Sequence, residues 1–150
     1  MDSLRIDNGL KKIEVNDEGE YIEFSVVSND FFRAFSDLLQ WFDAQENRQD
    51  IKDMEKQQED VVSENGEGIN YEALNNVLDI REKISKESCV KIDAIFGTDA
   101  SRKVFGGIIP DIFMIADFFE KITPFIEKYA KERNQTINKK YNKNRKGAKS

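Results

Sequence analysis

The stretch DIFMIADFFEKITPFIEKY, residues 111–129, carries the most regular hydrophobic pattern of the chain. Its large apolar residues follow one another at alternating steps of three and four, a spacing that places them on one face of an α-helix. Asp111 precedes the pattern as an N-cap. Because Pro124 cannot donate a hydrogen bond to the carbonyl of Glu120, we expect a kink there or a new start with Thr123 as N-cap. The predicted face consists of Ile112, Ile115, Phe119, Ile122, Ile126 and Tyr129, broadened by Phe113, Phe118 and Phe125.

Two further helices are predicted before this one. The first follows the N-cap residues 28–30, and the second covers about 71–96, where Gly97 suits a left-handed residue that ends a helix. Residues 98–105 form a short helical turn, capped by Thr98 or Asp99 and closed by glycines. The expected buried residues are Phe31, Phe35, Leu38 and Phe42 in the first helix, widened by Phe32, Leu39 and Trp41, and Leu74, Val77, Leu78, Ile84, Ile92 and Ile95 in the second.

Residues 10–27, LKKIEVNDEGEYIEFSVV, are predicted to form a β-hairpin. Apolar and polar residues alternate on either side of the segment 16–19, where Gly19 can adopt positive φ in the turn. A lone hairpin is marginal in water, so its apolar face must pack against the following helix. The predicted fold is therefore mainly α with a small N-terminal β-hairpin: a helical bundle of about three main helices plus a short helix.

The chain is predicted to form one α-helical domain, residues 1–133, followed by a basic C-terminal tail, 134–150. Residues 45–64 contain few large apolar side chains and form either an exposed helical arm or a linker, with the arm favoured. The last helix is expected to fray after Arg133. From Lys128 onward there are nine Lys/Arg and one acid, a net charge of +8, which leaves −14 on the preceding residues. Such a tail contacts an anionic surface, folds back on the acidic body, or stays solvated.

Composition excludes several classes of function. The chain has no His, which removes the usual general base and the commonest metal ligand, and its single Cys excludes an intramolecular disulfide or a cysteine zinc cluster. No apolar run approaches the ~20 residues of a membrane span, and the polar start, residues 1–5, does not resemble a signal peptide. We therefore expect a cytoplasmic protein without membrane, metal or cofactor.

The motifs that carry enzyme chemistry do not appear in the sequence. The glycines of 65–71 and 97–103 lack the spacing of a dinucleotide-binding fingerprint or a phosphate-binding loop. They are interpreted as residues that mark the ends of helices. The acidic turn 16–19 is too short for a calcium loop, and no pair of carboxylates is marked out as a hydrolase site. Cys89 has no activating neighbour and is interpreted as a packing residue. We therefore expect no catalytic residue and no small-molecule substrate.

Most of the aromatic residues are interpreted as core, and core packing alone is the favoured reading. The aromatic faces are nevertheless wider than one packing seam requires, which leaves the alternative of a surface for a helix-in-groove partner or for a homo-oligomer. The tail is a weak nucleic-acid signal, because it offers one aromatic residue and follows an acidic body that repels phosphate. The candidate partner-binding residues are Phe32, Trp41, Phe118, Phe119, Ile122, Phe125, Ile126 and Tyr129. The candidate anion contacts are Lys139, Lys140, Lys143, Arg145, Lys146 and Lys149.

Three segments resemble a small protein family of the tail region of Firmicutes siphophages and prophages. They are LKKIEVNDEGEYIEF (10–24), IDAIFGTDASRKVFGGIIPDIFMIADFFEKITPFIEKYAKER (92–133) and NKKYNKNRKG (138–147). Members of that family are described as tail assembly proteins or tape-measure chaperones. The resemblance rests on structural motifs and implies a non-catalytic role in the bacterial host cell during phage assembly.

The implied partner is the tape-measure protein or another phage tail protein. A tape-measure protein is a long helical chain with apolar stripes, and a chaperone for it needs exposed apolar helix faces and no active site. The alternative is a structural tail-completion component, or a weak nucleic-acid binder that uses the basic tail. An enzyme is the third class and the one that the sequence favours least.

Overall fold

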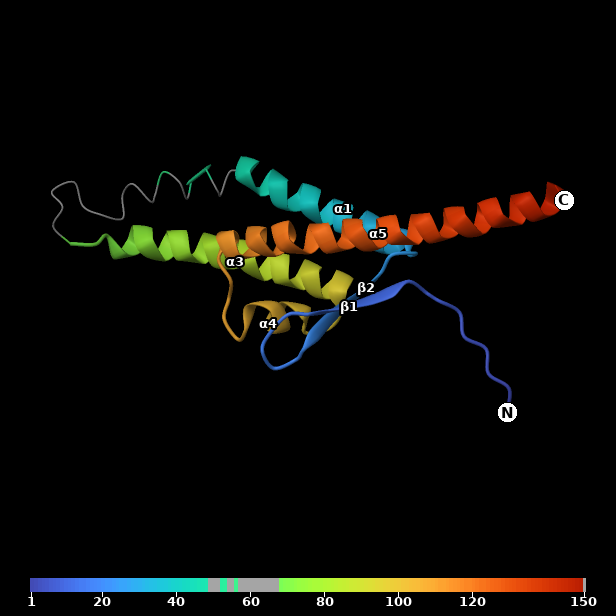
Figure 1. The fold of residues 1–150 in the computed structure, drawn as a ribbon. Coiled ribbons are helices and arrows are strands. Elements are labelled where there is room, and N and C mark those ends of the chain that lie inside the picture. Colours follow the sequence, from blue (N-terminus) through green and yellow to red (C-terminus); the bar gives the residue numbers. More distant parts are fainter. Residues whose placement is uncertain (49–51, 54–55, 57–67, 150) are drawn as a thin grey trace.

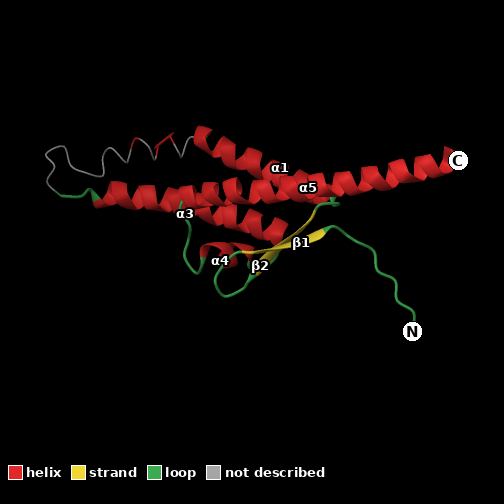
Figure 2. Cartoon of the chain, viewed as in Figure 1, coloured by secondary structure: helices red, strands yellow, loops and turns green. Residues whose placement is uncertain are grey.

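Three long helices lie side by side, and a β-hairpin and a short helix cover one side of them (Figures 1 and 2). The computed structural model describes residues 1–48, 52–53, 56 and 68–149, without the side chains of 46 and 143–149. Helix α1 (Asn29–Ala44) runs in the opposite direction to α3 (Tyr71–Phe96) and α5 (Ile112–Lys149). The predicted fold class is confirmed: a mainly helical bundle with a small N-terminal hairpin.

The hairpin pairs β1 (Leu10–Glu14) with β2 (Tyr21–Ser25) in antiparallel register, with Ile13 opposite Ile22. Its turn has the predicted chemistry, because Gly19 adopts φ +80°. The inner side chains Ile22, Phe24 and Val26 are buried. The hairpin therefore packs its apolar face on the helices, as a two-stranded sheet must to be stable.

Helix α1 (Asn29–Ala44) begins at Ser28, whose hydroxyl accepts a hydrogen bond from the N–H of Phe31 at 3.2 Å. Phe31 stacks on Phe24 of the hairpin with 5.2 Å between ring centroids, and Phe96 of α3 contacts both rings edge-on. Such offset and edge-to-face pairs contribute roughly 0.5–1.5 kcal/mol each beyond their buried area. This aromatic cluster joins hairpin, α1 and α3 in one core.

Helix α3 (Tyr71–Phe96) has the predicted bounds and is capped by the side chain of Asn70. Its buried stripe differs from the prediction at Leu78, which is 46 % exposed. Val77 and Ile84 are seven residues apart and occupy the buried face, so Leu78 points about 100° away from it. Gly97 ends the helix with positive φ (112°) as expected, but its ψ of 159° lies outside the left-handed helical region.

Helix α4 (Ala100–Phe105) is the predicted short turn, although Asp99 precedes it with φ 66° and makes no side-chain cap. Helix α5 (Ile112–Lys149) starts at the predicted cap, since Asp111 Oδ1 accepts from the N–H of Met114 at 2.8 Å. The helix continues through Pro124, so the restart with Thr123 as N-cap is wrong. The Thr123 hydroxyl instead donates to the carbonyl of Phe119 at 2.6 Å, a bond that belongs to a helix interior.

The helix also does not fray after Arg133, because α5 extends to Lys149 and the predicted tail is its last part. The segment 45–64 begins as a 3₁₀-helix, η1 (Gln45–Asn47). Residues 52–53 and 56 are helical, and the rest of the predicted arm lies outside the described residues. Within the described part of the chain, no helix is long and apolar enough to cross a membrane.

Candidate partner-binding surface

The structure separates the predicted partner-binding residues into core and surface. Four of those on α5 are buried, with exposed fractions of 4–8 %, and form the centre of the core with Ile115. Such side chains do not face solvent, so these four belong to the core, and their predicted contact with a partner stays a prediction. The buried four are Phe118, Phe119, Ile122 and Ile126.

The other four candidates reach the surface to different degrees. Phe125 is 41 % exposed, and the other three are half-buried beside the core. Lysines lie over two of those rings: Lys91 Nζ is 4.9 Å from the Trp41 ring centroid, and Lys11 Nζ is 5.2 Å from that of Tyr129. Phe125 is therefore the most exposed of the eight candidates.

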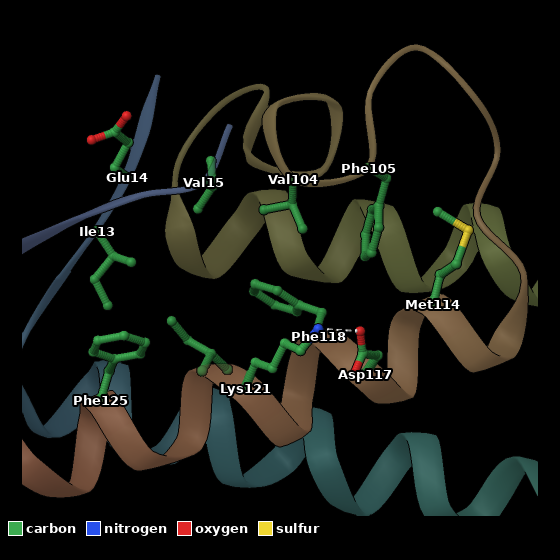
Figure 3. A pocket seen from close by; sticks show the side chains of 11 residues that line it. Ile13, Glu14, Val15, Val104, Phe105, Met114, Asp117, Phe118, Lys121 and Phe125 are labelled. Atoms are coloured by element: carbon green, nitrogen blue, oxygen red, sulfur yellow. Dashed lines mark hydrogen bonds and ion pairs between the residues drawn. The ribbon is translucent and has the colours of Figure 1, made fainter. Parts of the chain in front are cut away.

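Phe125 lies in an apolar groove of about 400 Å³ between the hairpin, α4 and α5, here called the hairpin groove (Figure 3). Ile13 of β1 lies over Phe125, and Phe118 forms part of the floor below Val15 and Val104. The groove is lined by Ile13, Glu14, Val15, Val104, Phe105, Met114, Asp117, Phe118, Lys121, Ile122 and Phe125. Its apolar lining with a few charges at the edge is typical of a binding groove.

Of the charged residues that line the hairpin groove, Glu14 lies on its β1 side, and Asp117 and Lys121 lie on its α5 side. Lys121 Nζ is 2.8 Å from Asp117 Oδ2, an exposed i,i+4 pair that Figure 3 shows as a dashed line. The hydrogen bond that Lys121 donates to Asp117 raises the pKa of Lys121, so the lysine stays protonated at neutral pH. The apolar floor of the groove therefore lies beside a charge-balanced pair.

Polar contacts join the hairpin turn to α4, beside the hairpin groove. Asn16 Nδ2 donates to the carbonyl of Lys103 at 3.1 Å, and Arg102 Nη2 lies 2.8 Å from Glu20 Oε2. The hydrogen bond from Arg102 lowers the pKa of Glu20 and keeps it ionised. These contacts join the hairpin turn to α4, and the residues that they connect are more than 80 positions apart in the sequence.

A second groove, of about 460 Å³, runs between α1 and α5 and is here called the α1 groove. Phe32 and Ile126 contribute apolar surface to it, and Asp43 and Glu127 contribute exposed carboxylates. Residues 123–130 of α5 line this groove and 114–125 line the hairpin groove, on faces of the helix roughly 150° apart. The two grooves therefore open on different faces of α5.

Sequence reasoning missed surface residues on both sides of α5. Val104, Phe105 and Met114 line the hairpin groove. Phe113 was predicted to broaden the apolar face of α5, which is wrong, because it is 83 % exposed and lies outside the groove. Ile108 and Ile109, before α5, are also exposed. The step of Phe113 away from the 112–115–119 seam was the available signal, because residues adjacent in a helix point about 100° apart.

The structure offers little nucleophilic chemistry around Cys89. The thiol is half-buried, and burial raises its pKa, which disfavours the reactive thiolate. No group of three or more metal-ligating side chains occurs among the residues that the structure describes. Of the candidate anion contacts, Lys139 and Lys140 are exposed on α5. The other four, Lys143, Arg145, Lys146 and Lys149, lie on the same helix in the part without described side chains.

A family model matches residues 18–150, from the hairpin turn to the end of the chain. The chain belongs to DUF6673, a family of unknown function. The match includes β2 and every helix, and therefore most of both grooves, whereas Ile13, Glu14 and Val15 of the hairpin groove precede it. No curated protein and no solved structure matches the chain.

Proposed function

We propose that this protein is a non-catalytic chaperone or adaptor of phage tail assembly that binds a helical partner, such as the tape-measure protein, in the hairpin groove. The observation that carries the proposal is the hairpin groove itself. It is open and apolar, has a volume of about 400 Å³, and includes the half-exposed ring of Phe125. The phage context comes from the resemblance of segments 10–24, 92–133 and 138–147, and the site of action is then the cytoplasm of the bacterial host.

The geometry supports a helix as the ligand. An amphipathic helix binds such grooves by inserting large apolar side chains at spacings of three, four and seven residues. The groove extends along α5 from Met114 to Phe125, a rise of about 16 Å, which corresponds to three turns of a partner helix. The apolar stripe of a tape-measure segment provides side chains at this spacing.

The first prediction tests this groove with a matched pair of variants. Phe125→Asp places a charge in the groove and is expected to abolish the soluble complex with the tape-measure protein. Phe113→Asp makes the same change on the same helix at an exposed position outside the groove, and is expected to leave the complex intact. The measurement is co-expression of both proteins from one genome, followed by size-exclusion chromatography with light scattering.

The controls separate binding from folding. Both variants are expected to retain the wild-type far-UV circular dichroism spectrum, because neither side chain is buried. An insoluble tape-measure protein, with the wild-type chain eluting alone, would contradict the chaperone and favour a structural tail component. Equal loss of the complex in both variants would contradict the hairpin groove as the binding site.

A further inference from the structure

Residues 134–149 of α5, here called the C-terminal extension, continue the helix beyond the bundle (Figure 1). All nine described side chains of this segment, 134–142, are exposed. The segment contains four Asn and six Lys/Arg with no acid, so helix propensity is low and like charges repel. A helix of this length and composition is marginal in water by itself, and a surface that binds it would stabilise it.

The extension carries the apolar stripe of the α1 groove further along α5. Ile126 and Ala130 line that groove, and Ile137 follows them by eleven and seven residues, which places it on the same helix face. Ile137 is 47 % exposed and Tyr141, four residues on, is 61 % exposed. The α1 groove therefore continues as an apolar stripe on α5, beyond the N-terminal end of α1.

We propose that the C-terminal extension binds in the α1 groove of a second copy of this chain, and that the two copies form a reciprocal antiparallel dimer. In this dimer the two α5 helices run antiparallel, and the twofold axis passes between Arg133 and Asn134. Each C-terminal extension then lies along the α1 groove of the other copy. Ile137 of one copy then lies against Ala130 of the other, a large side chain over a small one. The interface is isologous and closes on itself.

Charge complementarity selects a second copy as the occupant. In this register, residues 140–149 of one copy lie beside residues 118–127 of the other. The first segment contains five Lys/Arg, and the second includes Glu127 of the α1 groove. Asp43 belongs to the same region, because the ring of the preceding Phe42 lies 5.1 Å from that of Phe119. The described residues that line the α1 groove include two acids and no Lys or Arg. A basic helix therefore meets an acidic groove twice in each dimer.

The dimer predicts the mass of the full chain in solution. At about 100 μM protein and about 50 mM salt, light scattering is expected to give twice the 17.4 kDa of one chain. Ile137→Asp places a carboxylate at the apolar contact and is expected to raise the dimer dissociation constant at least tenfold. Thr136→Asp changes the charge equally on the neighbouring face and is expected to retain the dimer. A monomeric wild type, or an Ile137→Asp variant that dimerises like it, would overturn the proposal.

A charge exchange tests the pairing of groove and extension. The variant Asp43→Lys/Glu127→Lys and the variant Lys143→Glu/Arg145→Glu/Lys146→Glu are each expected to be monomeric alone, and their mixture is expected to dimerise. The control Asp2→Lys/Asp79→Lys, at exposed positions outside the groove, makes the same charge change as the groove variant and is expected to remain a dimer. Failure of the mixture to dimerise would overturn the pairing.

The same preparation distinguishes the other ligand that a basic helix can bind. If the wild type stays monomeric and its extension binds duplex DNA with an affinity that falls steeply with salt, the segment is a nucleic-acid contact and the dimer is wrong. Because the α1 groove and the hairpin groove lie on different faces of α5, the dimer and the proposed chaperone role fail or succeed independently.

Discussion

The side chain of Asn16 connects the hairpin turn to α4. Its Oδ1 accepts from the N–H groups of Glu18 and Glu20, while its Nδ2 donates to Glu20 and to the carbonyl of Lys103. Asn16→Ala removes these bonds and is expected to lower the free energy of unfolding by about 1–2 kcal/mol. Urea denaturation measures the loss, with Asp17→Ala, an exposed residue of the same turn, as a control expected to change it by less than about 0.5 kcal/mol. Equal losses would show that the contact with α4 contributes nothing.

Single residues also show where sequence reasoning reaches its limit. The turn chemistry of Asn16 and Gly19 was predictable because the bonds are local. The bond from Asn16 to Lys103 spans 87 residues, and the sequence carries no periodic signal for a contact of that kind. Leu78 likewise fits the predicted apolar stripe beside Val77, and only the position of α5 decides that Val77 is buried and Leu78 is exposed.

Among the helices, α5 accommodates a proline in its interior. Pro124 leaves the carbonyl of Glu120 without its helical donor, although Glu120 is exposed and water can satisfy it. Pro124→Ala restores the bond and is expected to raise the free energy of unfolding by about 2 kcal/mol, after allowance for the greater freedom of the unfolded chain. Thermal unfolding measures this as a rise in Tm of roughly 4–8 °C. The control Pro110→Ala, at a buried loop position, is expected to lower Tm or leave it unchanged, and a lower Tm for Pro124→Ala would contradict the argument.

The elements that the sequence predicted best are those with chemical start and stop signals. Ser28 and Asp111 cap their helices as expected, and α3 has its predicted bounds. The restart predicted at Pro124 was wrong because the proline is only a local stop signal, whereas burial of Ile122 and Ile126 on both sides of it holds the helix together. Tertiary packing therefore outweighs the local preference at this position.

For the whole molecule, the sequence indicated that a candidate site would be an aromatic helix surface, but it did not indicate where on the fold that surface would lie. Helical spacing identified the aromatic residues of α5, but it gives the relative directions of side chains and not which direction faces the core. Hairpin, α4 and α1 together cover Phe118 and Phe119 and leave Phe125 half-exposed. The apolar walls from β1 and α4 come from segments about 90 residues apart, so the hairpin groove exists only in the assembled fold.

The division between core and groove gives a stability prediction for the whole fold. Phe118 is 8 % exposed and contacts the rings of Phe96, Phe105 and Phe119, so Phe118→Ala leaves a cavity among hairpin, α3, α4 and α5. We expect a loss of about 3–5 kcal/mol in the free energy of unfolding. Phe125→Ala removes the same atoms from a half-exposed position and is expected to cost about 1 kcal/mol or less.

Denaturant unfolding of both variants, monitored by circular dichroism, compares the two costs directly. If only Phe118→Ala lowers the free energy of unfolding, Phe118 belongs to the core that stabilises the fold, and Phe125 is available to contact a ligand. Client binding lost in Phe125→Asp could then be assigned to the groove surface, since the fold itself does not depend on that ring. Equal destabilisation of the two alanine variants would place Phe125 in the core as well, and the hairpin groove would lose the side chain that makes it a binding surface.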